Sequence, residues 1–259
     1  MDFEALGYAL EDGIVTITLD RPAALNAVNA QMSRELPVAW ARFESDPAAR
    51  VAIITGSGDR ALSVGADLAD LPATEAGGLA GFRWTALQNA VSKPVICAVN
   101  GMAVGGGLHF VADSDIVLAA EHASFFDTHV KVGLVAGLEP VMLARRIPLE
   151  AVMRLALSGG AERLDAARAL QIGLVGELVP RERLMQRARE IATAIRSHSP
   201  AALARTRKAI WGAKELPLHE ALQQAWDLIM AQSSHPDATE GARAFLEKRP
   251  PRWRSPGED

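Results

Sequence analysis

The segment KPVICAVNGMAVGGGLHF, residues 93–110, decides how the rest of the sequence is interpreted. An apolar run, Pro94–Val99, ends at Asn100-Gly101, and three glycines, Gly105–Gly107, then precede a short apolar stretch. This pattern predicts a buried strand, a tight loop and a helix that begins at the glycines. Amides at a helix start point outward with the positive end of the helix dipole behind them, so they can bind an anion or a developing oxyanion. A packing turn would use the same glycines.

A second segment, SGDRALSVGADL at residues 57–68, has the same character and also follows an apolar run. Asp67 suits a helix N-cap, which would leave the amides of Gly65 and Ala66 free to face a cleft. An oxyanion hole needs two convergent backbone donors, and two loops of this kind could supply them. The glycine spacing matches neither GxGxxG nor a P-loop, so neither a dinucleotide site nor a P-loop is predicted.

Outward from these loops, strand patterns alternate with helical ones up to about residue 138, and helical patterns prevail after it. This order predicts an α/β fold with mostly parallel strands, a core domain over residues 1–195 and a helical region over 196–259. The predicted strands are Gly13–Leu19, Val51–Thr55, Pro94–Val99 and Ile116–Ala119. The predicted helices are Ala27–Phe43, Phe82–Val91, Gly107–Ala112, Pro140–Arg146, Glu150–Leu157, Asp165–Gln171, Arg183–Arg196, Ala201–Trp211 and Leu218–Ala231.

Composition argues against several classes of partner. The 259 residues carry a formal net charge of −4, so no overall field favours nucleic acid or an anionic membrane surface. No run reaches the roughly 18 apolar residues of a membrane span, and the N-terminus lacks the pattern of a secretory signal. The one cysteine, Cys97, lies in an apolar run and is interpreted as a core residue. We therefore expect a cytoplasmic protein without a metal site, a nucleic-acid partner or a membrane partner.

Five segments, taken in order, resemble the crotonase (enoyl-CoA hydratase/isomerase) family. They are RPAALNAVN (Arg21–Asn29), VAIITGSGDRALSVGADL (Val51–Leu68), KPVICAVNGMAVGGG (Lys93–Gly107), LDAARALQIGLVGELVP (Leu164–Pro180) and EGARAFLEKRPPRW (Glu240–Trp253). The resemblance implies a ClpP-like spiral of ββα units with C-terminal helices that drive assembly into a homotrimer or a dimer of trimers. It also implies an acyl-CoA substrate and no cofactor beyond the coenzyme A of that substrate.

The resemblance further implies roles for individual residues. Ala66 and Gly106 would donate the two hydrogen bonds to the thioester carbonyl. Phe245 and Lys248 would cover the adenine end of coenzyme A, from the same or a neighbouring subunit. Arg21 would either contact a phosphate or be an ordinary surface residue. The other implied contacts with coenzyme A are Ala23, Ala24, Leu25, Ser63, Gly65, Asp67, Leu68 and Gly105.

The sequence departs from the family at two places that matter for chemistry. Hydratases of the family place two glutamates toward the acyl chain, and the matching positions here hold His109 and His129. Histidine has an ordinary pKa near ~6.5, so a pair could act as base and acid at neutral pH. Asp113 and Asp115 are candidates to orient an imidazole, whereas we expect Asp127 to point away from His129 in an extended segment.

Glu139 also departs from the family, which usually has glycine there. Helix capping is one interpretation of this residue, and an acidic group near the acyl pocket is the other.

Three functions remain open on the sequence alone. The first is an enoyl-CoA hydratase or isomerase with Ala66 and Gly106 as oxyanion donors and the two histidines as proton carriers. The second is hydrolytic cleavage of a carbon–carbon bond in a β-dicarbonyl substrate at the same site, with a histidine activating water. The third is a catalytically silent member that binds or assembles, which the missing glutamates and the bulky Val64 would favour.

Overall fold

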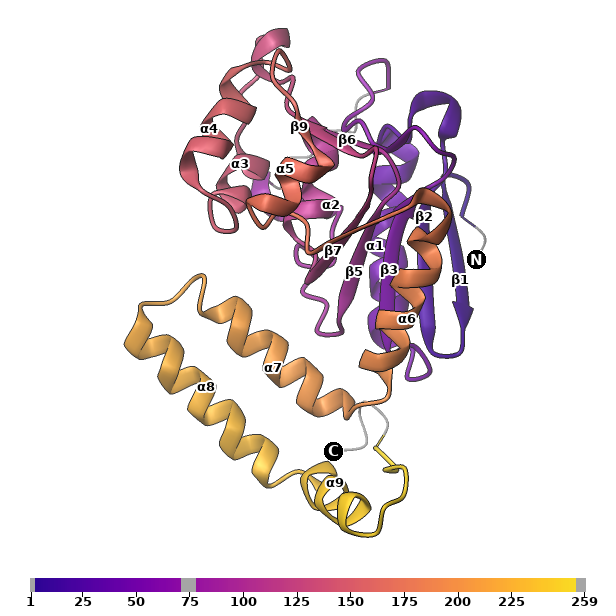
Figure 1. Cartoon of the computed structure of the whole chain (residues 1–259), viewed down its shortest axis with the longest axis vertical. Coiled ribbons are helices and arrows are strands. Elements are labelled where there is room, and N and C mark those ends of the chain that lie inside the picture. Colours follow the sequence, from indigo (N-terminus) through magenta and orange to yellow (C-terminus); the bar gives the residue numbers. More distant parts are fainter. Residues whose placement is uncertain (1–2, 71–77, 255–259) are drawn as a thin grey trace.

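A six-stranded sheet forms the centre of the computed structural model, which describes residues 3–70 and 78–254 (Figure 1). Its strand order is β1-β2-β3-β5-β7-β10, and every pair is parallel except β1 with β2. The parallel arrangement agrees with the predicted alternation of strands and helices. The strands are β1 (Leu6–Glu11), β2 (Ile14–Leu19), β3 (Val51–Gly56), β5 (Val95–Val99), β7 (Ile116–Ala120) and β10 (Glu177–Val179).

A second, smaller sheet has the order β4-β6-β8-β9. Each of its first three strands follows a strand of the large sheet after a short turn, so β3 leads to β4, β5 to β6 and β7 to β8. The chain thus repeats one strand-turn-strand step three times, which places successive turns and loops at one end of the molecule. The strands are β4 (Ala61–Ser63), β6 (Met102–Val104), β8 (Ser124–Phe126) and β9 (Leu164–Asp165).

Helices cover both faces of the large sheet. On one face lies α1 (Ala30–Ser45), whose Trp40 and Phe43 are fully buried and whose first turn is capped by the Asn29 side chain. On the other face lies α6 (Leu184–Arg196), which buries Leu184, Ala188 and Ala192 against β3, β5 and β7. In β3 the side chains alternate between the two cores, with Val51 and Ile53 in one and Ala52 and Ile54 in the other, as a strand covered on both sides requires.

Short helices pack at the end of the sheet where the loops gather (Figure 1). The first of them, α2, follows the 3₁₀ turn η3 (Gly105–Gly107) directly and contacts α3. Because these helices pack next to the loops, they bring residues that are distant in sequence close together at this end of the sheet. They are α2 (Leu108–Ala112), α3 (Leu138–Leu143), α4 (Leu149–Leu157) and α5 (Ala166–Gln171).

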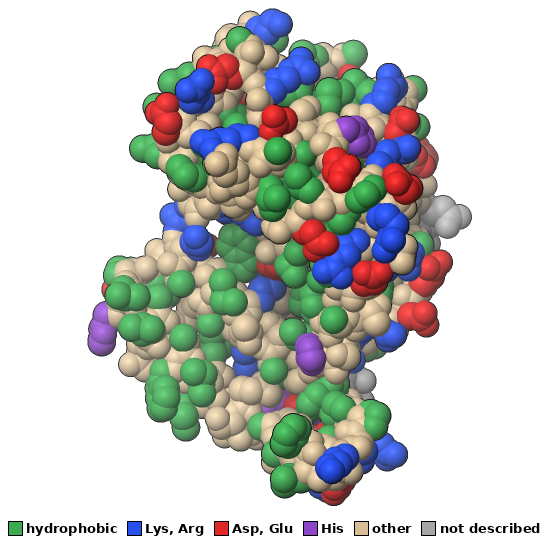
Figure 2. All heavy atoms as spheres, viewed as in Figure 1, with side chains coloured by type: hydrophobic (Ala, Val, Ile, Leu, Met, Phe, Trp, Pro, Cys, Tyr) green, Lys and Arg blue, Asp and Glu red, His purple; other side chains and the backbone are tan. Residues whose placement is uncertain are grey.

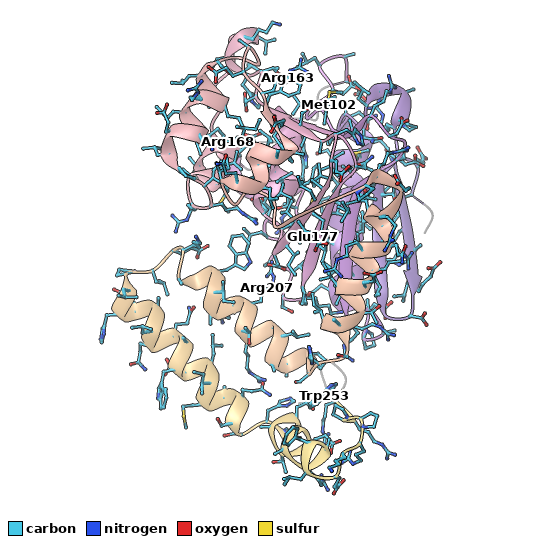
Figure 3. The ribbon with its side chains drawn as sticks, viewed as in Figure 1. Met102, Arg163, Arg168, Glu177, Arg207 and Trp253 are labelled. Atoms are coloured by element: carbon cyan, nitrogen blue, oxygen red, sulfur yellow. The ribbon has the colours of Figure 1, made fainter. Side chains whose placement is uncertain are left out.

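The last three helices extend away from the sheets. Helices α7 (Pro200–Gly212) and α8 (Leu218–Ser233) form an antiparallel hairpin, and α9 (Pro236–Leu246) follows at its foot (Figure 1). The hairpin is attached to the main body by Arg207, which points from α7 toward the sheet and pairs with Asp115 at 2.8 Å (Figure 3). Ser199 accepts a hydrogen bond from the Ala202 amide, so its side chain caps the first turn of α7. No helix in the described ranges is long and apolar enough to cross a bilayer.

The structure corrects two secondary-structure predictions. Phe82–Val91 is a series of turns rather than a helix, because the Asn89 side chain donates hydrogen bonds to the Arg83 and Thr85 carbonyls and Ala90 is left-handed. Strands also continue after residue 138, in β9 and β10, where only helices were expected. Both are too short to show a periodicity of two.

Candidate active site

The two glycine-containing loops predicted to form an oxyanion hole meet in the structure. Gly65 has a φ of +85°, and a Cβ added to it would lie 2.7 Å from the Gly106 nitrogen. A Cβ on Gly106 would in turn lie 3.5 Å from the Ala66 nitrogen and only 2.9 Å from the Trp84 ring. Glycine is therefore needed at both positions so that the loops can approach each other. This approach brings the amides of Ala66 and Gly106 into one small region.

The Ala66 amide faces away from its neighbouring segment. Val28 forms a parallel bridge with Ala66, in which the Val28 amide binds the Gly65 carbonyl and the Asp67 amide binds the Val28 carbonyl. In a parallel bridge, the partner residue's own N–H points to the opposite side. The bridge therefore leaves the Ala66 amide available on the side where Gly106 lies.

Buried polar side chains hold the Ala66 loop in place. The Ser63 hydroxyl donates to the Asn26 carbonyl at 2.8 Å and accepts from the Gly65 amide, and the Ser63 side chain is fully buried. Asn26, also buried, binds the carbonyls of Ser57 and Ala61 through its side-chain amide. Ser63 thus has a structural task here, and its contact with coenzyme A stays a prediction. Sequence reasoning missed Asn26, although it lies within the Arg21–Asn29 motif.

Asp67 and Arg21 form a further support for this loop. Arg21 Nη1 lies 2.8 Å from Asp67 Oδ2 and also donates to the Ala27 carbonyl at 2.7 Å. The hydrogen bond from Arg21 lowers the pKa of Asp67 below its ordinary value. Asp67 accepts from the Ala69 amide in a turn, and no helix begins there among the described residues, so the predicted helix cap is wrong.

His129 lies beside the Gly105–Gly107 loop and is paired with a buried carboxylate. Its Nδ1 lies 3.0 and 3.1 Å from the two oxygens of Asp127, whose side chain is 0% exposed. The expectation that Asp127 points away was wrong, because β8 ends at Phe126 and His129 has helical dihedral angles, which brings both side chains to one side. The hydrogen bond from Asp127 raises the pKa of His129, with burial opposing it and the charges of Asp127 and Glu139 adding to it.

His129 also lies next to the oxyanion loop. A Cβ added to Gly105, which has a φ of +50°, would lie 3.3 Å from His129 Cε1. In residues 3–70 and 78–254, no polar group pairs with His129 Nε2, since the hydrogen bonds of this ring go through Nδ1. The ring is therefore held from behind by Asp127, with Nε2 directed away from the carboxylate.

His109 lies on α2, three residues after Gly106, and only 1% of it is exposed. Its Nε2 lies 3.2 Å from Glu139 Oε1 at an angle outside hydrogen-bond geometry, and its Nδ1 lies 3.4 Å from the Gln88 side-chain amide. The Phe82 ring packs against it with centroids 4.9 Å apart. His109 is thus surrounded by protein on both nitrogen sides.

Glu139 enters this region from the first turn of α3 and is buried. Burial raises the pKa of Glu139, but the close approach and charge of His109, with a further contribution from the charge of His129, outweigh burial and lower it overall. Of the two interpretations of this residue, the acidic group near the site fits the structure, since its carboxylate faces His109.

The aspartates proposed as orienters differ in position. Asp113 Oδ2 lies 4.0 Å from His109 Nδ1 and accepts from the Thr85 hydroxyl at 2.7 Å. Asp115 is not near either histidine, because it binds Arg207 and Trp211 of α7. Cys97 is buried, and burial raises the pKa of its thiol to about 12, which agrees with a core residue.

The remaining predicted contacts with coenzyme A lie in two places. Ala23 and Ala24 form the 3₁₀ turn η1 (Pro22–Ala24), Leu25 follows it in a left-handed conformation, and Leu68 is exposed beyond Asp67. Phe245, at the end of α9, is 84% exposed, and Lys248 follows that helix. Figure 1 places α9 at the far end of the chain from α2, so these two residues do not join the site within one chain.

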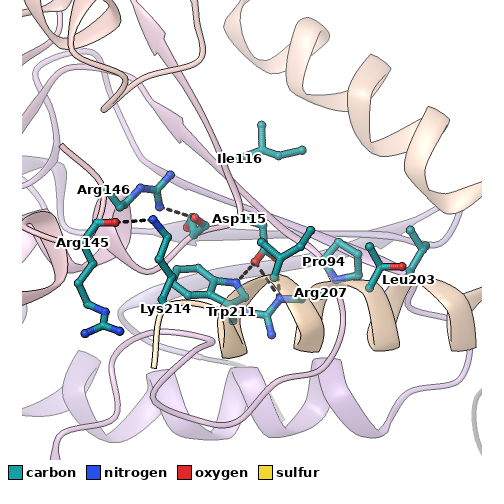
Figure 4. A pocket seen from close by; sticks show the side chains of 12 residues that line it. Pro94, Asp115, Ile116, Arg145, Arg146, Leu203, Arg207, Trp211 and Lys214 are labelled. Carbon is teal, nitrogen blue, oxygen red and sulfur yellow. Dashed lines mark hydrogen bonds and ion pairs between the residues drawn. The ribbon is translucent and has the colours of Figure 1, made fainter. Parts of the chain in front are cut away.

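A cavity of about 470 Å³ lies elsewhere, between α7 and the starts of β5 and β7 (Figure 4). Three of the four cations that line it are already engaged: Arg207 pairs with Asp115, Lys214 binds the Arg145 carbonyl, and Arg146 binds three backbone carbonyls. The loops that contain Gly65 and Gly106 instead follow the carboxyl ends of strands. This cavity is thus separate from the predicted site. No cluster of three or more metal-binding side chains occurs in the described part of the chain.

Comparisons with known proteins agree with this architecture. A family model described as enoyl-CoA hydratase/isomerase matches residues 9–256. The carnitinyl-CoA dehydratase of Citrobacter koseri is 36% identical over 267 residues, covering 97% of this chain and 98% of that protein. The Escherichia coli protein of that name is 36% identical over 263 residues, with the same coverage.

Solved structures agree as well. An enoyl-CoA hydratase/isomerase from Mycobacterium paratuberculosis superposes with a TM-score of 0.90 at 41% identity, covering 98% of this chain and 99% of that one. An enoyl-CoA hydratase from Mycobacterium tuberculosis superposes with a TM-score of 0.87 at 34% identity, covering 96% and 98%. These matches confirm the predicted α/β fold, and the chain belongs to the enoyl-CoA hydratase/isomerase family.

Proposed function

We propose that this member of the family adds water to, or removes it from, an acyl-CoA substrate. The amides of Ala66 and Gly106 would bind the thioester carbonyl oxygen, and His129, backed by Asp127, would move the proton at the α-carbon. The relatives named carnitinyl-CoA dehydratase support this reaction class. Donors that are in place before charge develops can supply the largest single contribution to such a reaction.

The hydration reaction depends on the thioester carbonyl. When water adds to the β-carbon of a 2-enoyl thioester, the electrons of the double bond move toward the carbonyl oxygen and form an enolate. Two amides at that oxygen stabilise the enolate more than the neutral carbonyl, which lowers the barrier. A proton delivered to the α-carbon then completes the product. The reverse sequence removes water from a 3-hydroxyacyl thioester.

One observation carries the proposal: the pair of Asp127 and His129 lies directly beside Gly105, the neighbour of the oxyanion donor Gly106. The buried carboxylate holds the proton on Nδ1 and stabilises the imidazolium, so Nε2 is the nitrogen that can exchange a proton with the substrate. The raised pKa of His129 keeps a useful fraction of imidazolium near neutral pH.

The experiment is to assay crotonyl-CoA, longer 2-enoyl-CoAs, 3-hydroxyacyl-CoAs and carnitinyl-CoA with the wild type and His129→Ala. We expect the substitution to lower kcat by about 10²- to 10⁴-fold, the usual contribution of general acid–base catalysis. Binding of butyryl-CoA, followed by calorimetry, should change little. His219→Ala, on an exposed turn of α8, is the matched control and should behave as wild type. Acyl-CoA binding without any turnover would instead indicate a catalytically silent member.

Hydrolytic carbon–carbon cleavage remains a second candidate, because an imidazole backed by a buried carboxylate can also activate water to attack a carbonyl. In that case the oxyanion hole would hold the enolate that leaves. Cyclic β-diketones and β-keto-CoAs assayed beside the enoyl-CoAs distinguish the two. Release of a carboxylic acid from the β-dicarbonyl compounds, with no hydration of enoyl-CoAs, would favour this second function.

We also propose that the chain assembles as a homotrimer or a dimer of trimers. An exposed apolar stripe on α8 supports self-association, because surfaces of this kind mark interfaces (Figure 2). It consists of Leu218, Leu222, Trp226, Ile229 and Met230. Light scattering should give the mass of three or six chains, each of 27.6 kDa. A monomer at micromolar concentration would contradict this.

A further inference from the structure

We propose that Glu139, rather than His109, is the second proton carrier of the site, and that His109 is a positioning residue that holds Glu139. This inference rests on the proposed function and identifies the partner of His129 in it. The sequence alone pointed to the two histidines, because they occupy the positions of the family's glutamates. The structure places a carboxylate, that of Glu139, beside His109 from helix α3.

The surroundings of His109 place another protein group beside each of its ring nitrogens. Its Nε2 faces Glu139 at 3.2 Å, and its Nδ1 faces Gln88 at 3.4 Å and Asp113 at 4.0 Å. A general base needs a nitrogen within hydrogen-bond reach of the proton that it takes. With 1% of the residue exposed and the Phe82 ring against it, His109 is placed to contact other protein groups.

Glu139 is placed differently. Its Oε1 is directed at His109, which leaves the second carboxylate oxygen for another partner. Glu139 and His129 each shift the pKa of the other through their charges, so the two groups lie within electrostatic reach. His129 Nε2 is likewise free of any polar partner in the described residues. Glu139 and His129 belong to separate segments, and His129 lies next to Gly105 of the oxyanion loop.

The charge states of Glu139 and His129 suit the addition of water to the substrate. Burial raises the pKa of Glu139, but His109 from α2 and His129 from the loop after β8 outweigh it and lower that pKa overall. Asp113, which follows α2, is a further charged neighbour. Glu139 is therefore a carboxylate near neutral pH. His129 has a raised pKa, with Asp127 and Glu139 as its acidic neighbours. An ionised base and a protonated acid are what water addition needs at the outset.

The Glu139 carboxylate takes a proton from water as the water oxygen bonds to the β-carbon. The π electrons shift to make the enolate, whose oxygen the Ala66 and Gly106 amides bind. The His129 imidazolium then gives its Nε2 proton to the α-carbon, and the enolate electrons form that bond. Glu139 is left protonated and His129 neutral, and one proton transfer through solvent restores the starting state.

The first test compares Glu139→Gln, Glu139→Asp and His109→Gln on the best enoyl-CoA substrate. We expect Glu139→Gln to lower kcat by about 10²-fold or more with little change in butyryl-CoA binding, and Glu139→Asp to recover part of the loss. His109→Gln should cost about tenfold, as loss of a supporting partner does at other sites. It should also move the acidic limb of kcat/KM to higher pH, because Glu139 loses the group that lowers its pKa. Glu150→Gln, on the exposed start of α4, is the matched control.

The second test separates this inference from the proposed function. Butyryl-CoA has no double bond, so exchange of its α-proton in D₂O needs the oxyanion amides and His129 but not Glu139. We expect Glu139→Gln to keep exchange while losing hydration, and His129→Ala to lose both. If His129→Ala stays active, the proposed function fails. If His129→Ala is inactive but Glu139→Gln hydrates normally, or if the His109→Gln loss equals that of Glu139→Gln with no shift of the limb, only the role of Glu139 is overturned.

Discussion

The two histidines that the sequence predicts as proton carriers have opposite surroundings. The side chain of His129 is 23% exposed and is held from one side by Asp127, while that of His109 is 1% exposed and has protein groups near both nitrogens. Residue type and motif position are therefore insufficient to assign a role. The contacts on the far side of each ring decide which nitrogen can meet a substrate.

The carboxylate beside each histidine also comes from a different source. Asp127 precedes His129 by two residues and belongs to the same loop, so local backbone geometry forms that pair. Glu139 reaches His109 from α3, through the packing of α2 against α3. In the first pair the carboxylate positions the imidazole, which carries the proton. In the second pair we infer that the imidazole positions the carboxylate, which carries the proton.

Asp127→Asn should have the larger effect of the two changes that test this comparison. An asparagine can still accept the His129 amide hydrogen bond but cannot stabilise an imidazolium, so we expect kcat to fall by about 10²-fold or more. The pKa of His129 should fall with the loss of Asp127, since that hydrogen bond raises it. Activity that needs the imidazolium is lost as pH rises through this pKa, so the basic limb of the kcat profile should move to lower pH.

The control for this experiment is Asp227→Asn, on the exposed surface of α8, which should leave rate and profile unchanged. A fall in kcat without movement of the basic limb would mean that Asp127 only supports the fold of the loop. Thermal unfolding of both variants would show that directly. Wild-type kinetics in Asp127→Asn would remove the basis for treating His129 and Asp127 as a functional pair.

Much of the fold was predictable because its signals are local. The apolar runs at Val51–Thr55, Pro94–Val99 and Ile116–Ala119 became β3, β5 and β7, with ends within about a residue of those predicted. The meeting of the Gly65 and Gly106 loops was also predictable, because both loops follow buried strands and their glycines remove the side chains that would keep them apart. These features follow from periodicity and from backbone sterics.

The contacts that assign roles in the site were less accessible. The rule of alternation in an extended segment failed at Asp127, because the chain turns into a helical conformation at His129. The apolar spacing over Phe82–Val91 predicted a helix, yet the Asn89 side chain binds the Arg83 carbonyl, which a helix would pair with the Leu87 amide. The approach of Glu139 to His109 depends on how two short helices pack, which no sequence interval of this chain encodes.

Asp113→Asn tests the other side of the comparison and should have the smallest effect. Asp113 is buried, and burial is the chief cause that raises its pKa and disfavours its charged form. An asparagine oxygen can keep the hydrogen bond from the Thr85 hydroxyl, and we expect a stability change of about 1 kcal/mol and kcat within about threefold of wild type. Stopped-flow hydration assays of Asp113→Asn and Asp127→Asn give the ratio of their kcat values directly. If Asp113→Asn lost as much activity as Asp127→Asn, His109 would depend on Asp113 as His129 does on Asp127, the two histidines would be equivalent, and Glu139 would no longer be needed to explain the second half of the site.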